Sequence, residues 1–298
     1  MKKGQSSRTA EAAAALRANH LQNADDPIFS DPFALEMTSW GWKHLLTHPL
    51  TVKVMNSSVL NHTLGLLTGQ VVGRSRYAED LLQHAIAQGV QQYVLVGAGL
   101  DSFILRQATK YPHLKIFEVD HPDTQAKKQQ KLCQLGELPT NVEFVSIDFE
   151  QESIADALAR SGLQQDQAAF FSWLGTTHYL EPQTTLMTLQ SIAQITALGS
   201  EVVLDYSIDY RELDGVERWG SLFVSQFTRI LKEPLKGQFS PQNLHEAVSY
   251  IGYDVVEDLS GDGLNERYFQ GRPDHIRHTM ATHMLHLRLS SQGSRRCH

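Results

Sequence analysis

The sequence is poor in the features that mark secreted, membrane-spanning and nucleic-acid-binding proteins. Only 2 of its 298 residues are cysteines, and the distance along the chain between Cys133 and Cys297 suggests neither a disulfide framework nor a cysteine-based metal site. No apolar run approaches the roughly 20 residues that cross a bilayer, and residues 1–20 lack the apolar segment of a signal peptide. The formal net charge of −7 leaves no basic excess for nucleic acid. We therefore expect a cytoplasmic protein that binds neither membranes nor nucleic acid, and the oligomeric state stays open.

The bulk composition is that of an ordinary soluble globular protein. Hydrophobic residues make up 41% of the chain and charged residues 20%. The length allows one large α/β domain or two small ones, with an ample hydrophobic core. Evidence on function must therefore come from local motifs.

The most informative stretch begins at residue 93. Residues 93–96, Tyr-Val-Leu-Val, are apolar and suit a strand that is buried on both faces of a parallel sheet. Gly97-Ala-Gly99 follows at once, and glycines at this point allow a tight turn and the close approach of a ligand to the backbone. Asp101 or Ser102 is placed to cap a helix that opens next.

A second strand over residues 114–119 ends in Asp120, and an acid at that position can hold the two hydroxyls of a ribose. The third position of the dinucleotide-binding pattern is Ser102 rather than glycine, and a dinucleotide needs a phosphate cradle at the helix end. A nucleoside without phosphates, such as S-adenosylmethionine, needs only the turn and the acid. The unit favours S-adenosylmethionine, while a turn that only reverses the chain stays open as an alternative.

Four segments together resemble one known family. They are RSRYAED at 74–80, GAGLDS at 97–102, FEVDHP at 117–122 and FSWLGTTHYL at 171–180. They are similar to the leucine carboxyl methyltransferase-like family of S-adenosylmethionine-dependent methyltransferases, and the last segment resembles a bacterial O-methyltransferase subgroup. The resemblance implies a single α/β, Rossmann-like class I methyltransferase domain over residues 1–298, with a seven-stranded, mostly parallel sheet whose last strand is antiparallel. It also implies a helical cap at residues 9–70 and a lid insertion at residues 206–240.

The same resemblance assigns the cofactor site. Arg74 aligns best with the family's carboxylate-binding arginine and Arg76 is the second choice, although both could also be solvated surface charges. Asp148 is implied to accept a hydrogen bond from the adenine amino group, with Phe149 beside the ring. The residues expected to bind S-adenosylmethionine, or the product S-adenosylhomocysteine, are Arg74, Arg76, Gly97, Ala98, Gly99, Asp101, Asp120, His121, Asp148, Phe149, Trp173 and Leu174.

The segment after the fourth predicted strand, residues 168–174, is expected to face the methyl acceptor, because ligands of open α/β folds bind at the carboxyl edge of the sheet. Thr177, His178 and Tyr179 are therefore the predicted catalytic residues. His178 is the first candidate for a general base, while a packed structural histidine is an equally good interpretation. Many relatives carry an acid directly before Gly175, and Leu174 in its place puts that cofactor contact in doubt.

These observations predict an O-methyltransferase that transfers a methyl group from S-adenosylmethionine to a carboxylate or a hydroxyl of a small molecule. The C-terminal carboxyl group of a protein or peptide is an alternative acceptor. An NAD(P)-dependent oxidoreductase and a non-catalytic S-adenosylmethionine-binding module are alternatives of another class. No metal is expected, because His275, His278, His283 and His286 do not follow a recognised ligand spacing.

Overall fold

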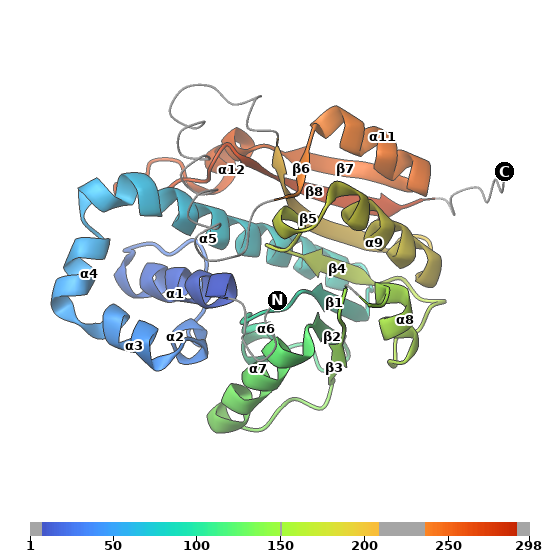
Figure 1. Cartoon of the computed structure of the whole chain (residues 1–298), viewed down its shortest axis with the longest axis horizontal. Helices are drawn as coiled ribbons and strands as arrows, with labels where there is room; N and C mark the ends of the chain where they lie inside the picture. Colours follow the sequence, from blue (N-terminus) through green and yellow to red (C-terminus); the bar gives the residue numbers. More distant parts are fainter. Residues whose placement is uncertain (1–7, 150, 209–235, 291–298) are drawn as a thin grey trace.

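The structure is a computed structural model that describes residues 8–149, 151–208 and 236–290, and for residues 58–63 the backbone alone. It shows a sheet with helices on both faces and a helical cap at one end (Figure 1). The helices of this part of the chain are α1 (Arg8–Asn23), α2 (Ala34–Met37), α3 (Trp40–Thr47), α4 (Pro49–Met55), α5 (Ser58–Ala87), α6 (Phe103–Arg106), α7 (Pro122–Leu135), α8 (Ile154–Ala159), α9 (Pro182–Ile195), α11 (Pro241–Ile251), α12 (Gly261–Tyr268) and the short 3-10 helix η1 (Thr177–Tyr179).

The strands form one sheet in the order β3-β2-β1-β4-β5-β8-β7, and β6 pairs with β5 beside this path. They are β1 (Gln92–Val96), β2 (Lys115–Asp120), β3 (Val142–Ser146), β4 (Phe170–Trp173), β5 (Glu201–Ile208), β6 (Gln238–Phe239), β7 (Tyr253–Leu259) and β8 (Thr282–Leu289). The last strand, β8, runs antiparallel to β5 and β7, and the other pairs are parallel. The predicted fold class and the antiparallel last strand are confirmed. The two-residue strand β6 was not expected, because two residues carry no readable alternation.

The strand order places a topological switch point between β1 and β4. From β1 the chain moves outward through β2 and β3 and then returns to the other side of β1 as β4. Ligands of open α/β sheets bind at the carboxyl edge of the strands beside such a switch point. Most of the predicted site residues lie at this edge, whereas Arg76 does not.

Two hydrophobic cores fill the space on the two faces of the sheet. Val94 and Val96 point into one core with residues of α8, α9 and α11, whereas Tyr93 and Leu95 point into the other with residues of α5, α6 and α7. This alternation follows from the strand period of two residues. Each fully buried side chain of this size contributes roughly 1.5–3 kcal/mol to stability, so the positions of the strand ends are firmly set.

The N-terminal cap consists of α1–α4 and the first part of α5, and Figure 1 shows it at one end of the molecule. The sequence predicts helices near residues 33–46, 52–68 and 71–88. The first is divided, because Thr38 adopts an extended conformation and its hydroxyl donates to the carbonyl oxygen of Leu35 (2.7 Å). The other two are largely one helix, the 30-residue α5. As a result one continuous helix, α5, runs from the cap to the sheet.

Some predictions fall outside the described residues. These are most of the lid insertion predicted at 206–240, of which residues 209–235 are not described, and Cys297. In the ranges that are described, no helix combines the length and the apolarity required to cross a membrane.

Candidate cofactor and acceptor site

The glycine turn after β1 lies in direct contact with the loop after β4. Gly97 and Gly99 have positive φ angles of 66° and 50°, and the N–H groups of Gly97 and Ala98 both donate to the carbonyl oxygen of Val119 (2.8 and 3.2 Å). A Cβ atom added to Gly97 would lie 2.6 Å from Cγ2 of Thr176. The turn therefore requires glycine for both its backbone conformation and its packing.

Asp120 ends β2 beside this turn and binds it directly. Its Oδ2 accepts the N–H of Gly99 (2.5 Å), and its Oδ1 accepts the N–H of His121 (2.6 Å). Burial raises the pKa of Asp120, and these two hydrogen bonds oppose the shift. Each carboxylate oxygen has a second lone pair, so the geometry suits a pair of ribose hydroxyls. The imidazole of His121 instead caps α7, where Nδ1 accepts the N–H of Asp123 (3.2 Å).

The two predicted arginines of α5 point in different directions, because residues two positions apart on a helix do not share a face. Arg74 reaches the loop after β4, where Nη1 donates to Oδ2 of Asp205 (3.0 Å). Its guanidinium lies against Gly175, so closely that a Cβ atom added to Gly175 would be 2.6 Å from Nη2. Arg76 instead forms a half-exposed ion pair with Asp80 (2.8 Å), one turn further along α5. Only Arg74 is thus placed at the carboxyl edge of the sheet.

Asp205, near the end of β5, joins the predicted residues of this edge. Its Oδ2 contacts Nε2 of His178 (3.0 Å) as well as Arg74, and its Oδ1 accepts the N–H of Gly175 (2.6 Å). The hydroxyl of Thr177 donates to the backbone carbonyl oxygen of the same residue. Burial alone would raise the pKa of Asp205, but His178 and Arg74 outweigh it and hold the pKa well below its usual range. Asp205 is therefore a buried anchor whose negative charge is stabilised by His178 and Arg74.

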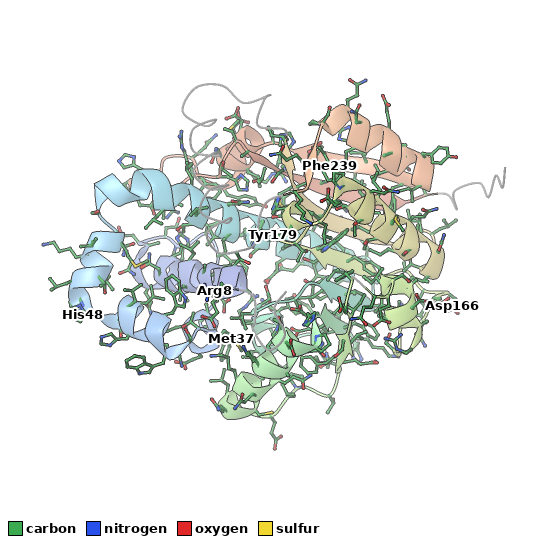
Figure 2. All side chains as sticks on the ribbon, in the orientation of Figure 1. Arg8, Met37, His48, Asp166, Tyr179 and Phe239 are labelled. Carbon is green, nitrogen blue, oxygen red and sulfur yellow. The ribbon has the colours of Figure 1, made fainter. Side chains whose placement is uncertain are left out.

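His178 has both ring nitrogens engaged. Nε2 contacts Asp205, and Nδ1 lies 2.8 Å from the hydroxyl oxygen of Ser207. The ring is almost fully buried, and its edge meets the ring of Tyr179 at a centroid distance of 6.4 Å. Tyr179 is half-buried and lies near the middle of the molecule in Figure 2. A general base needs a nitrogen within reach of the acceptor's proton, so this geometry favours the structural interpretation of His178.

The remaining predicted cofactor-binding residues differ in burial and in the contacts that they make near the carboxyl edge of the sheet. Asp101 accepts the N–H of Phe103 (2.6 Å), and although burial would raise its pKa, Arg106, Arg17 and Lys128 outweigh burial and lower it. Trp173 is completely buried in the core with α8, α9 and α11, so only its backbone can reach a ligand. The others lie at the edge: Asp148, which accepts from the side chain of Gln151 (2.7 Å), and the partly buried Phe149 and Leu174, which pack on opposite cores.

The residues at this edge fit S-adenosylmethionine. Asp120 is placed for a ribose, and Arg74 carries five N–H donors, of which Asp205 engages one, so a carboxylate can bind the others. The buried hydroxyl of Thr176, which touches the glycine turn, has no hydrogen-bond partner in the described part of the chain, and such atoms in native proteins call for a ligand or water. Across the described ranges, no group of three or more histidine, cysteine, aspartate or glutamate residues is arranged to hold a metal ion.

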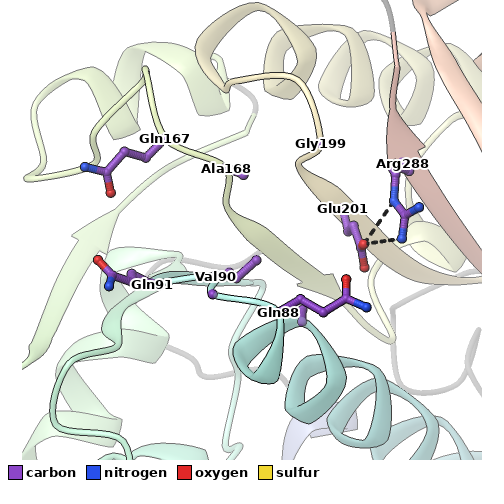
Figure 3. Close-up of a pocket in the computed structure, with 10 residues that line it drawn as sticks. Gln88, Val90, Gln91, Gln167, Ala168, Gly199, Glu201 and Arg288 are labelled. Carbon is purple, nitrogen blue, oxygen red and sulfur yellow. Dashed lines mark hydrogen bonds and ion pairs between the residues drawn. The ribbon is translucent and has the colours of Figure 1, made fainter.

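A pocket of about 460 Å³ lies elsewhere, at the opposite edge of the sheet (Figure 3). Val90 and Gln91, Ala168 and Gly199 line it, and they precede β1, β4 and β5 respectively. The pocket therefore opens at the amino ends of these strands, where Glu201 binds Arg288 (2.8 Å). It is separate from the edge that carries Arg74 and Asp120.

Sequence reasoning missed three residues of the site. Asp205 was recognised only as the end of a strand, although an acid at the carboxyl end of a parallel strand is the same signal that singled out Asp120. Thr176 and Ser207 gave no signal, since a threonine or serine in a loop or strand is too common to single out.

Comparison with known proteins extends this description. A family model described as leucine carboxyl methyltransferase matches residues 10–193, which include the cap, the glycine turn and the loop after β4. YktD of Bacillus subtilis, named as a candidate S-adenosyl-L-methionine-dependent methyltransferase, is 30% identical over 219 residues, which are 72% of this chain and 71% of YktD. A similarly named protein of Mycolicibacterium smegmatis is 30% identical over 204 residues, 66% of this chain and 65% of its own length.

Two solved structures share the fold at low sequence identity. A DUF574 family protein from Streptomyces avermitilis has a TM-score of 0.63 and 10% identity, with 96% of this chain and 98% of that chain covered. A candidate methyltransferase from Thermobifida fusca has a TM-score of 0.60 and 12% identity, with 97% of each chain covered. These two structures support the fold, and the family assignment rests on the sequence matches.

Proposed function

Because the chain belongs to the leucine carboxyl methyltransferase family of S-adenosylmethionine-dependent methyltransferases, we propose that it methylates an oxygen atom of a small molecule, and that this oxygen belongs to a carboxylate. Membership of the family also makes the NAD(P)-dependent oxidoreductase the weaker alternative. The proposal goes beyond family membership in two respects, the oxygen acceptor and its ionised state.

The observation that carries the carboxylate assignment is the engagement of His178. Both of its ring nitrogens are within hydrogen-bond distance of other groups, Asp205 and Ser207. A neutral hydroxyl acceptor gains typically 10²- to 10⁴-fold in rate from a positioned base. A carboxylate is already nucleophilic and needs no base, so it suits an edge at which the predicted base is occupied.

S-adenosylmethionine supplies an electrophilic methyl group, and the protein contributes alignment and exclusion of water. In the proposed assignment Asp120 holds the ribose and Arg74 holds the carboxylate of the methionine part. Thr177 and His178 shape the acceptor side without exchanging a proton. Tyr179, which is half-buried next to them, is the third predicted residue of the acceptor side.

The test uses S-adenosylmethionine labelled in the methyl group, with a panel of small carboxylic acids, phenols, amines and a peptide that ends in leucine. Methyl esters release labelled methanol in mild alkali, whereas methyl ethers and methylamines do not. We expect alkali-labile label on one or more small carboxylic acids. Label that resists alkali would overturn the carboxylate assignment, and label on the peptide alone would make the protein C-terminus the acceptor. Binding of S-adenosylmethionine without turnover of any acceptor would favour a non-catalytic binding module.

A further inference from the structure

The glycine loop after β1 is tied to the N-terminal cap by buried charged and polar side chains. Arg17 of α1 donates through Nη2 to the carbonyl oxygen of Leu100 (2.8 Å) and through Nε to Oδ2 of Asp31 (2.8 Å). The other oxygen of Asp31, Oδ1, accepts the hydroxyl of Ser102 and the backbone N–H of Phe33 (3.2 Å for the latter). The cap thus holds Leu100 through Arg17 and Ser102 through Asp31.

A second arginine extends the network into α5. Arg106, the last residue of α6, donates through Nε to the hydroxyl oxygen of Ser102 (2.8 Å). Its two terminal nitrogens bind the carboxylate of Glu79 on α5 (3.0 and 2.6 Å). The guanidinium also stacks over the ring of Phe29 in the cap, with Cζ 4.8 Å from the ring centroid. The loop is thus held from the cap and from α5 at the same time.

These groups are buried deeply enough for their contacts to matter energetically. The side chains of Arg17, Asp31 and Arg106 are 6%, 0% and 4% exposed. Buried charges persist only when they are paired and hydrogen-bonded, and removal of one partner leaves the others uncompensated. We therefore expect loss of Asp31 to disturb the conformation of residues 97–102 more than loss of an exposed hydrogen-bonding side chain would.

We propose that Asp31 is a positioning residue for the cofactor loop, and that cofactor binding and docking of the N-terminal cap stabilise each other through it. The inference rests on the proposed function in one respect, since it takes the glycine loop as the S-adenosylmethionine site. Asp31 itself touches no cofactor in this scheme. Residues 8–33 then form a wall of the cofactor site, and bound cofactor strengthens the docking of this wall.

The network also explains two features of the sequence. Ser102 occupies the position at which a dinucleotide-binding loop has its third glycine, and here its hydroxyl joins Asp31 to Arg106. Asp31-Pro32-Phe33 is a turn in the cap, and its acid is the acceptor of that hydroxyl. The turn at Asp31 therefore binds the loop at Ser102, although the two residues are 71 positions apart in the sequence.

Thermodynamic linkage makes the proposal testable in both directions. If Asp31 couples the two parts, bound S-adenosylmethionine must slow hydrogen exchange of the backbone amides of α1 and of residues 25–33. The same coupling must appear as weaker cofactor binding when the network is cut. A residue that only stabilises the fold would lower the melting temperature and leave the dissociation constant unchanged well below that temperature.

The experiment compares wild type, Ser102→Ala and Asp31→Asn with the control Asp25→Asn, which alters an exposed acid in the same cap segment. Calorimetric titration gives the dissociation constant of S-adenosylmethionine, and hydrogen exchange is measured with and without it. Asp31→Asn removes a buried charge and could unfold the cap. Ser102→Ala keeps every charge of the network, so it tests the coupling in a folded protein. We expect the dissociation constant of Ser102→Ala to rise about 10-fold and the protection of α1 by cofactor to disappear, while Asp25→Asn behaves as wild type.

Two results would overturn the coupling between the cofactor and the cap. One is an unchanged dissociation constant for Ser102→Ala, and the other is an exchange rate in α1 and residues 25–33 that does not respond to cofactor in wild type. Failure of the proposed function looks different, because wild type itself would then bind no S-adenosylmethionine in the titration. Faster exchange of the loop amides 97–102 in unliganded Ser102→Ala is expected in either case, and its absence would also contradict the positioning role.

Discussion

Arg74 on α5 and Asp205 on β5, separated by 131 positions in the sequence, form an ion pair of 3.0 Å beside the glycine that follows β4. The pair is nearly buried, and Asp205 is held ionised by Arg74 and His178 together. Because one end of the guanidinium is fixed, its other N–H groups face a constant direction. A carboxylate that binds there meets an arginine that has already lost its side-chain freedom.

This relationship predicts the phenotype of Asp205→Asn. The amide keeps an acceptor for the N–H of Gly175 but loses the charge that anchors Arg74. We expect S-adenosylmethionine and S-adenosylhomocysteine to bind about 10-fold more weakly, whereas 5′-methylthioadenosine, which lacks the carboxylate, is unaffected. Ser207→Ala is the matched control, because Ser207 contacts His178 and not Arg74. Tighter binding of the two carboxylate ligands in Asp205→Asn would show that Asp205 competes for Arg74 instead of positioning it.

A second prediction concerns Asp120, whose two oxygens accept the N–H groups of Gly99 and His121. Asp120→Ala removes the group proposed to hold the ribose. Loss of charge-assisted hydrogen bonds of this kind costs about 1.5–3 kcal/mol, which corresponds to roughly 10- to 100-fold weaker binding. The loss should be equal for S-adenosylmethionine, S-adenosylhomocysteine and 5′-methylthioadenosine, since all three share the ribose. Calorimetric titration that finds an unchanged affinity would remove Asp120 from the site.

The sheet was largely predictable because its strands carry a strong local signal. The segments at residues 93–96, 114–119 and 168–174 were predicted as strands, and they correspond to β1, β2 and β4. The cap was read less well. The division between α2 and α3 depends on the extended backbone of Thr38 and on a hydrogen bond of its own side chain, which no periodicity reveals.

The site was predictable where a motif stood at the end of a strand, and not where contacts join distant segments. Gly97, Gly99 and Asp120 follow adjacent strands and were found together. The convergence of Arg74, His178 and Asp205 depends on how α5 crosses the sheet, which is a tertiary property. The link between Asp31 and Ser102 is likewise invisible in the sequence, because either residue alone is an ordinary turn or cap residue.

A third prediction concerns pH. His278 is buried next to α5, and burial lowers its pKa from 6.5 to about 4. The unfolded chain therefore takes up a proton near pH 6.5 while the folded protein does not, so stability present above pH 6.5 is lost as the pH falls toward 4. For this one group the loss amounts to roughly 2–3 kcal/mol near pH 4.5. Urea unfolding at a series of pH values should show it as a smaller pH dependence in His278→Gln than in wild type.

Wild type must be compared with His278→Gln because other buried groups also titrate between about pH 4 and 7. Burial also lowers the pKa of His20 to about 4, and it raises that of Glu118 to about 7, which makes stability fall as pH rises from 4.5 toward 7. Only the difference between wild type and His278→Gln isolates His278. A difference that stays constant from about pH 7.5 to 4.5 would show that His278 protonates equally in both states.

The most direct test of the account is a calorimetric titration of wild type, Arg74→Ala and Arg76→Ala with S-adenosylmethionine, S-adenosylhomocysteine and 5′-methylthioadenosine. The two arginines lie on the same helix, but only Arg74 reaches the loop after β4, while Arg76 pairs with Asp80. We predict that Arg74→Ala weakens the two carboxylate-bearing ligands about 10- to 100-fold and leaves 5′-methylthioadenosine unchanged, with Arg76→Ala equal to wild type. Equal weakening of all three ligands by Arg74→Ala, or weakening by Arg76→Ala instead, would contradict the assignment of this edge as the cofactor site.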